Sequence, residues 1–241
     1  MDDIVDINTL FGPLPAASAD LAVDALLGLM QTHQVSAACT LSTLGILLDP
    51  ILGNAATRAA CAEQTNLVPA ATLNPAMFFG DTTALCHLVE EGFRLLRFFP
   101  GNQNWKIDFS PFHWLMTHIQ DTGLPVMINI DSVGEITDLT RALRSHEGAV
   151  ILSQIDHSTI AEAVAALHMF PKWHIETSRL LAPGCLKLAV ECIGPDRLLF
   201  GTGAPAHPIA SGLHTVRYAG LDQAAVNMIL GSNARRVLNL S

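Results

Sequence analysis

Residues 110–130 have the sequence SPFHWLMTHIQDTGLPVMINI, which combines a helix pattern with a strand pattern. Ser110–Asp121 is predicted as a helix, and Gly123 provides its end. Val126–Ile130 is apolar throughout and lacks the polar alternation of a strand with one face in water. Such a strand is typical of a parallel sheet that is covered on both faces. The segment therefore predicts an α/β fold.

The same strand–helix unit recurs along the whole chain. The expected strands are Ile4–Asn8, Val35–Thr43, Leu67–Asn74, Phe93–Phe99, Val126–Ile130, Ala149–Ile155, Trp173–Thr177 and Leu198–Thr202. Among the expected helices are one capped by Ser18, then Asp49–Gln64, Asp81–Glu91, Val133–His146, Thr159–Met169, Gly184–Ile193 and a closing Asp222–Leu240. Repeating units of about 30 residues predict parallel strands with right-handed crossovers. We expect residues 1–241 to form one (β/α)8 TIM barrel, with a doubly wound open sheet as the alternative.

Composition excludes several classes of partner. The 241 residues are 50% hydrophobic and only 15% charged, with a net charge of −9. An acidic chain has no bulk attraction for nucleic acid or anionic membranes, and no apolar run reaches the ~18 residues of a membrane span. The low charge content predicts a homo-oligomer. The acidic start and five scattered cysteines, expected to be buried thiols, predict a cytoplasmic protein.

Four passages carry a resemblance to a known family. They are IVDINTLFG at Ile4–Gly12, GLPVMIN at Gly123–Asn129, GPDRLLFGTGAP at Gly194–Pro205 and ILGSNARRVL at Ile229–Leu238. The chain resembles the amidohydrolase-related proteins of the amidohydrolase superfamily, which are metal-dependent hydrolases and decarboxylases on TIM barrels. The resemblance implies the same barrel, with its chemistry at the carboxyl ends of the strands.

The metal-ligand positions depart from the family pattern. The resemblance implies ligands from two histidines after strand one, histidines that end strands five and six, and a strand-eight aspartate. Those positions here hold Asn8, Leu10, Asn129, Gln154 and Gly203. None supplies an imidazole, thiolate or carboxylate, so we expect no metal ion at the usual site and no other cofactor. A displaced metal would have to use side chains such as Asp156, His157, Glu176 and His207.

Polar side chains at the predicted strand ends are the candidate binding residues. The neutral amides of Asn8, Asn129 and Gln154 either pair with one another or bind a ligand. Arg97, between apolar neighbours, requires an anionic partner, which is either Glu176 or a substrate carboxylate or phosphate. Arg179 is a second candidate anion clamp, although a surface salt bridge explains it equally well.

Candidates for proton transfer follow the later strands. His157 and His207 are preferred because imidazole titrates near neutral pH, and Asp131 and Glu176 complete the candidate catalytic set. One hypothesis is metal-independent hydrolysis, lactone opening or decarboxylation of a small carboxylated substrate. The other is a non-catalytic protein that binds a small anion or assembles with a partner. Whether the chain is an enzyme stays open at this stage.

Overall fold

Eight parallel strands form a barrel in a computed structural model that describes residues 3–14 and 21–240. The strands are β1 Ile4–Phe11, β2 Val35–Ser42, β3 Leu67–Thr72, β4 Leu95–Phe98, β5 Val126–Asn129, β6 Val150–Ser153, β7 Trp173–Glu176 and β8 Leu198–Leu199. Their spatial order follows their order in the chain, and each pairs in parallel with the next. This order confirms the predicted (β/α)8 barrel over the doubly wound sheet. The assignment of 1–241 as one domain stays a prediction.

Hydrogen bonds between β1 and the segment that begins with β8 close the barrel. The backbone N–H of Ile7 donates to Phe200 O at 3.0 Å, and that of Gly203 donates to Asn8 O at 2.7 Å. Farther along, Leu10 N–H donates to Ala204 O at 2.8 Å. These bonds extend the pairing beyond the two residues of β8, so the carboxyl end of β1 lies beside residues 200–204.

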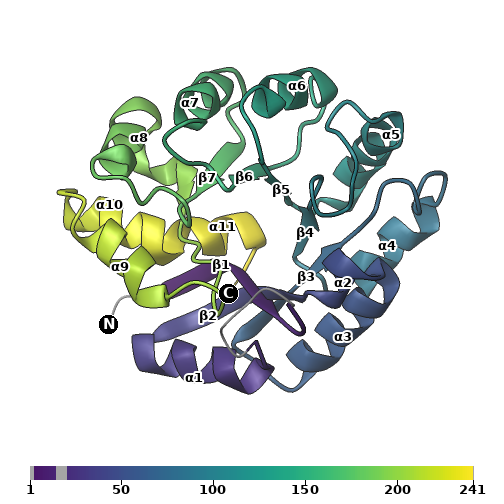
Figure 1. Cartoon of the computed structure of the whole chain (residues 1–241), viewed down its shortest axis with the longest axis horizontal. Coiled ribbons are helices and arrows are strands. Elements are labelled where there is room, and N and C mark those ends of the chain that lie inside the picture. The colour runs from purple at the N-terminus through teal and green to yellow at the C-terminus, as the bar shows by residue number, and fades with distance from the viewer. Residues whose placement is uncertain (1–2, 15–20, 241) are drawn as a thin grey trace.

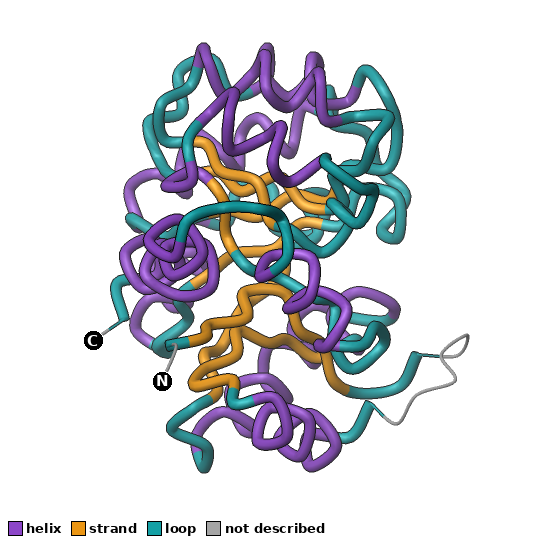
Figure 2. Tube along the Cα trace, turned by 90° about the vertical axis from the view of Figure 1, so that its left-hand side faces the viewer, coloured by secondary structure: helices purple, strands orange, loops and turns teal. Residues whose placement is uncertain are grey.

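Helices surround the strands (Figure 1), and the strands stay central in the perpendicular view (Figure 2). The α-helices are α1 Val23–His33, α2 Leu44–Leu47, α3 Pro50–Ala62, α4 Thr82–Glu90, α5 Ser110–Ile119, α6 Glu135–Ala142, α7 Ile160–Met169, α8 Cys185–Ile193, α9 Ile209–Arg217, α10 Gln223–Asn227 and α11 Asn233–Leu238. Short helical turns are η1 Gln120–Thr122, η2 Pro195–Arg197 and the π-helix η3 Met228–Ser232. None of the described helices has both the length and the apolar character needed to span a membrane.

Strand alternation divides the apolar side chains into two cores. On β4, Leu96 and Phe98 pack in the outer core between strands and helices, whereas Leu95 packs in the inner core that fills the barrel. Successive side chains of a strand point to opposite faces. Arg97 therefore points into the barrel, as expected from Phe98 pointing outward.

Several predicted boundaries are wrong. Val133–His146 shrinks to Glu135–Ala142 because Gly134 lies in the left-handed region and His146 turns back to the Met116 carbonyl. The closing helix divides into α10, η3 and α11, and a short α2 precedes α3. Ser18, the predicted cap, lies outside the described residues. Cys86 and Cys192 are exposed rather than buried.

The π-helix lets the closing segment pack tightly against the start of β1. Gly231 lies against Asp3, so close that a Cβ on Gly231 would fall 1.8 Å from the Asp3 carbonyl oxygen. Asn233, two residues later, is buried and donates from Nδ2 to Pro195 O at 2.8 Å and Leu198 O at 2.9 Å. Both contacts tie the last helix to the amino-terminal end of the barrel.

We expect Gly231→Ala to destabilise the protein by about 1–3 kcal/mol, because the added methyl group forces the backbone of Asp3 away. Gly28→Ala is the matched control. Apart from the adjacent backbone of its own helix, no atom of the described residues lies within 4 Å of its added Cβ, so it should stabilise α1 by roughly 0.5–1 kcal/mol. Urea unfolding measures both, and equal effects would contradict this packing.

Candidate functional site

Polar side chains replace apolar ones at the carboxyl end of the barrel interior. Arg97 on β4, Asn129 on β5, Ser153 on β6 and Glu176 on β7 are all buried where their strands end. Apolar side chains such as Leu95, Met127, Ile151 and Leu199 fill the interior before this layer. Because the loops that follow parallel strands gather at this end, the buried polar layer marks the candidate site.

Arg97 is the cation of this layer. Its side chain donates from Nη2 to Asn8 Oδ1 at 2.7 Å and from Nη1 to Thr9 O at 3.3 Å. Its guanidinium carbon lies 5.0 Å from the centroid of the Phe99 ring, a cation–π contact. Burial lowers the pKa of Arg97 to about 10, so the group is still charged at neutral pH. Its Nε has no hydrogen-bond partner among the residues that the structure describes.

Glu176 is the buried anion across the barrel from Arg97. Its Oε1 accepts from Ser153 Oγ at 2.8 Å, Gln154 N at 3.1 Å and Ser178 Oγ at 2.7 Å. Oε2 accepts from Ser178 N at 2.8 Å. The two oxygens of this fully enclosed side chain therefore have four hydrogen-bond donors.

Two residues connect the two charges. Asn8 Oδ1 accepts from Arg97, and Asn8 Nδ2 donates to Ser178 Oγ at 3.4 Å; the Ser178 hydroxyl in turn donates to Glu176. The direct ion pair between Arg97 and Glu176, one of the two alternatives for Arg97, is therefore wrong. The side-chain amide of Asn8 takes the guanidinium bond instead, because an amide can both accept and donate.

Asp6 is a buried acid that the sequence interpretation missed. Its Oδ1 accepts from Asn8 N at 3.0 Å and Thr202 N at 3.1 Å, and Oδ2 accepts from the Thr202 hydroxyl. Burial raises the pKa of Asp6 to about 7. The only signal in the sequence was a carboxylate inside the apolar run of the first strand.

A pocket of about 190 Å³ opens beside this network, where the β7 and β8 segments meet α9. Arg179 and His207 line it together with the hydroxyl-bearing Ser178, Thr202 and Ser211, and with Leu181, Pro208 and Gly212. Arg179 and His207 are exposed, and neither side chain makes a hydrogen bond or ion pair with another described residue. Ser178 belongs to both the pocket and the buried network, and so joins them.

His207 lies over the strand-eight position at which the family has its aspartate. A Cβ built on Gly203 would fall 2.8 Å from His207 Cδ2. Gly203 has a φ of +78°, which favours glycine, and its carbonyl accepts from His207 N at 3.2 Å. The imidazole thus covers the place where a side chain at position 203 would begin.

The other predicted site residues do not join this pocket. His157 is exposed on the loop after β6, and Asp131 is exposed and accepts from Gly101 N at 3.2 Å. Asn129 is 9% exposed, and its Oδ1 accepts no hydrogen bond from residues 3–14 or 21–240. Gln154 has a φ of +67° and reaches the network through its backbone N–H alone. Mutual pairing of the three amides, one of the two alternatives for them, is therefore wrong.

The residues at the family's ligand positions do not fit a divalent metal ion. Asn8 and Asn129 are neutral amides, Leu10 and Gly203 have no donor, and the Asn8 oxygen is already bound to a guanidinium. Across residues 3–14 and 21–240, no three His, Cys, Asp or Glu side chains lie close enough together to hold a metal. The displaced set of Asp156, His157, Glu176 and His207 does not converge either.

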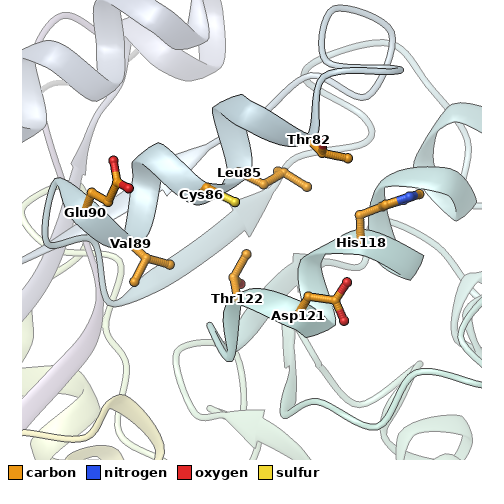
Figure 3. Close-up of a pocket in the computed structure, with 8 residues that line it drawn as sticks. All are labelled: Thr82, Leu85, Cys86, Val89, Glu90, His118, Asp121 and Thr122. Carbon is orange, nitrogen blue, oxygen red and sulfur yellow. The ribbon is translucent and has the colours of Figure 1, made fainter.

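A second pocket, of about 340 Å³, lies on the outside of the barrel between α4 and the end of α5. Figure 3 shows Cys86 and Val89 of α4 facing Thr122 across it. Its walls also carry Glu90, His118 and Asp121. This pocket lies between two outer helices and not at the carboxyl ends of the strands, so it is not the candidate site.

Comparisons with known proteins agree with the fold. The family model described as Amidohydrolase matches residues 53–240, and the chain belongs to this family. A search of curated proteins finds no match. Among solved structures, 2,6-dihydroxybenzoate decarboxylase from Rhizobium has a TM-score of 0.77 at 17% identity, over 100% of this chain and 99% of that one.

Two further structures are similar at the same level. A dihydroxybenzoic acid decarboxylase from Polaromonas sp. JS666, solved with manganese and 2-nitroresorcinol, has a TM-score of 0.78 at 15% identity, over 100% of this chain and 98% of that one. A protein assigned as a 2-pyrone-4,6-dicarboxylic acid hydrolase from Pseudomonas putida has a TM-score of 0.78 at 16% identity, over 100% and 99%. At these identities the likeness concerns the fold.

The raised pKa of Asp6 makes stability depend on pH. Between pH 4 and 7 the folded state holds a proton on Asp6 that the unfolded chain releases, so this stabilisation is present at low pH and is lost as the pH rises through about 7. We expect a loss of up to about 1.4 kcal/mol per pH unit. Asp6→Asn should flatten this part of the profile of unfolding free energy against pH, whereas the exposed Asp108→Asn should not. Parallel profiles for wild type and Asp6→Asn would refute the assignment.

Proposed function

We propose that the chain is an enzyme that hydrolyses a small carboxylated ester or lactone without a metal ion, in the pocket between the β7 and β8 segments. The observation that carries this proposal is that Arg179 and His207, one guanidinium and one imidazole without partners among the described residues, line the same pocket at the carboxyl end of a barrel. The first group binds a carboxylate, and the second moves a proton near neutral pH.

The reaction balances with the groups in this pocket. Neutral His207 takes a proton from water, and the water oxygen attacks the carbonyl carbon of the substrate. The bond from that carbon to the ester oxygen breaks, and the imidazolium returns its proton to the departing oxygen. Arg179 holds the carboxylate of the substrate throughout and so fixes the orientation of the carbonyl.

Hydrolysis is favoured over decarboxylation by the position of Arg179. A guanidinium bound to a carboxylate stabilises the negative charge in the ground state, and this charge disperses when CO₂ leaves. The same contact does not raise the barrier to ester cleavage, because the bound carboxylate keeps its charge throughout that reaction. The names of the similar structures, a dihydroxybenzoate decarboxylase and a pyrone dicarboxylic acid hydrolase, include both reactions on carboxylated compounds.

The test uses 2-pyrone-4,6-dicarboxylate as the lactone and 2,6-dihydroxybenzoate as the decarboxylation probe, each with EDTA present. We expect lactone opening, and we expect His207→Gln to lower kcat by roughly 10²–10⁴ with little change in melting temperature. The matched control His157→Gln removes an exposed histidine outside the pocket and should leave kcat unchanged. Arg179→Met should raise KM by about tenfold or more because it removes the carboxylate contact.

Three outcomes would contradict the proposal. Turnover that EDTA abolishes and Zn²⁺ or Mn²⁺ restores would show a working metal site. Decarboxylation without lactone opening would reverse the choice of reaction. Binding of either probe without turnover would favour the alternative of a non-catalytic protein that binds small anions.

We also propose that the protein is a homo-oligomer. Leu47, Leu48, Ile51 and Leu52, at the junction of α2 and α3, are 46–71% exposed in a chain with only 15% charged residues. Contiguous exposed apolar side chains typically mark contact surfaces. Sedimentation should show a multiple of 25.8 kDa, and Leu48→Glu with Ile51→Lys should shift it toward the monomer. A wild-type monomer at micromolar concentration would refute this.

A further inference from the structure

The carboxyl end of the barrel holds one buried cation among several acidic groups. Arg97 is the only arginine or lysine that is fully buried in the described part of the chain. The acidic groups nearest to it in charge terms are Glu176 on β7 and Asp6 on β1, and Asp6 is protonated in the folded state below about pH 7. An ion taken out of water is unfavourable unless an opposite charge and hydrogen bonds compensate it. Each charge in this layer therefore depends on the others.

Arg97 also occupies the neighbourhood in which a metal ion would have to lie. Arg97 binds directly to Asn8, which occupies the first metal-ligand position of the family. Gln154 occupies another of these ligand positions, and its backbone N–H donates to Glu176. The Polaromonas structure contains manganese. Two cations close together in a medium of low polarity repel each other, so a guanidinium bound to Asn8 opposes the binding of a divalent ion there.

We infer that Arg97 is the fixed positive charge of this barrel in place of a metal ion, and that it positions Ser178 in the pocket wall through Asn8. The inference rests on the proposed metal-independent site, but its test does not depend on turnover. It assigns Arg97 a positioning role rather than the direct contact with a substrate that the sequence had left open.

The amide at position 8 fits this role for a specific reason. Asn8 Oδ1 accepts from the guanidinium, and its Nδ2 donates to Ser178. A carboxylate would accept from Arg97 but has no hydrogen to donate to Ser178, and leucine would do neither. The Ser178 hydroxyl then donates to Glu176, so every link from the cation to the anion is a directed hydrogen bond.

The experiment compares melting temperatures of Arg97→Met, Arg97→Lys, Glu176→Gln and the double variant Arg97→Met/Glu176→Gln. Arg97→Met should lower the melting temperature by about 10 °C, because it leaves Asn8 Oδ1 without its donor and removes the one cation of the buried layer that holds Glu176. Arg97→Lys keeps the charge and should recover at least half of that loss. The double variant should melt above Arg97→Met, although it carries one more substitution.

A matched pair on the surface provides the control. Arg141 and Asp138 of α6 form an exposed salt bridge with an N–O distance of 2.7 Å. Arg141→Met, Asp138→Asn and their combination should each change the melting temperature by no more than about 2 °C, with additive effects.

Two results would overturn the inference. Equal losses for Arg97→Met and Arg97→Lys, together with no recovery in the double variant, would show that Arg97 acts by packing alone. If Arg97→Met does not fold, the double variant should still fold, and failure of both would count against the inference. Zn²⁺ or Mn²⁺ bound stoichiometrically to the wild type would refute the inference and the metal-independent site together. Without such binding, loss of the inference leaves the proposed function intact.

Discussion

The buried charges of Arg97 and Glu176 impose the strictest requirement in the barrel. Removing either from water is costly, and the cost is offset only when each has well-placed partners. Glu176 meets this requirement with four hydrogen bonds, which come from Ser153 at the end of β6, from Gln154 and twice from Ser178 after β7. Arg97 meets it with two acceptors on β1. The register of these strands cannot slip without leaving a charge unpaired. The polar layer therefore specifies the geometry of the barrel end on which the pocket is built.

Much of the fold could be predicted from the sequence because it depends on local patterns. Apolar strands such as Val126–Asn129, and the helices between them, follow the periodicity of side chains, and period-two alternation places Arg97 inside once Phe98 is outside. Helix ends are less predictable because they depend on tertiary contacts. The closing helix contains a π-helical turn where Gly231 lies against Asp3, and nothing in residues 222–240 alone reveals that contact.

The site could be predicted only in part, for the same reason. The sequence indicates which residues end each strand, and so it identifies Arg97, Glu176, Asn8, Arg179 and His207 as candidates. It does not indicate which of them meet. The link between Asn8 and Ser178 joins residues 170 positions apart, and a single serine has no signature that separates it from any other loop serine. Asn129 also ends a strand, as the sequence predicts, but its Oδ1 has no hydrogen-bond partner among the described residues. Which groups a strand-end side chain meets depends on residues far away in the chain, and the periodicity of the strand carries no information about them.

One arginine of the candidate site, Arg97, is buried inside the barrel, and another, Arg179, is exposed at its rim, and this difference decides which of them an anionic ligand can reach. The chain carries a net charge of −9, so at long range it repels an anionic substrate. At physiological ionic strength this repulsion is screened beyond about 8 Å, and short-range contacts decide binding. Arg97 is enclosed and bound within the network, whereas Arg179 is exposed in the pocket, so the proposed function assigns the contact with the substrate to Arg179. In that proposal Ser178, which contacts both the buried network and the pocket, lets the inner charge pair orient the pocket wall while the exposed arginine provides the attraction.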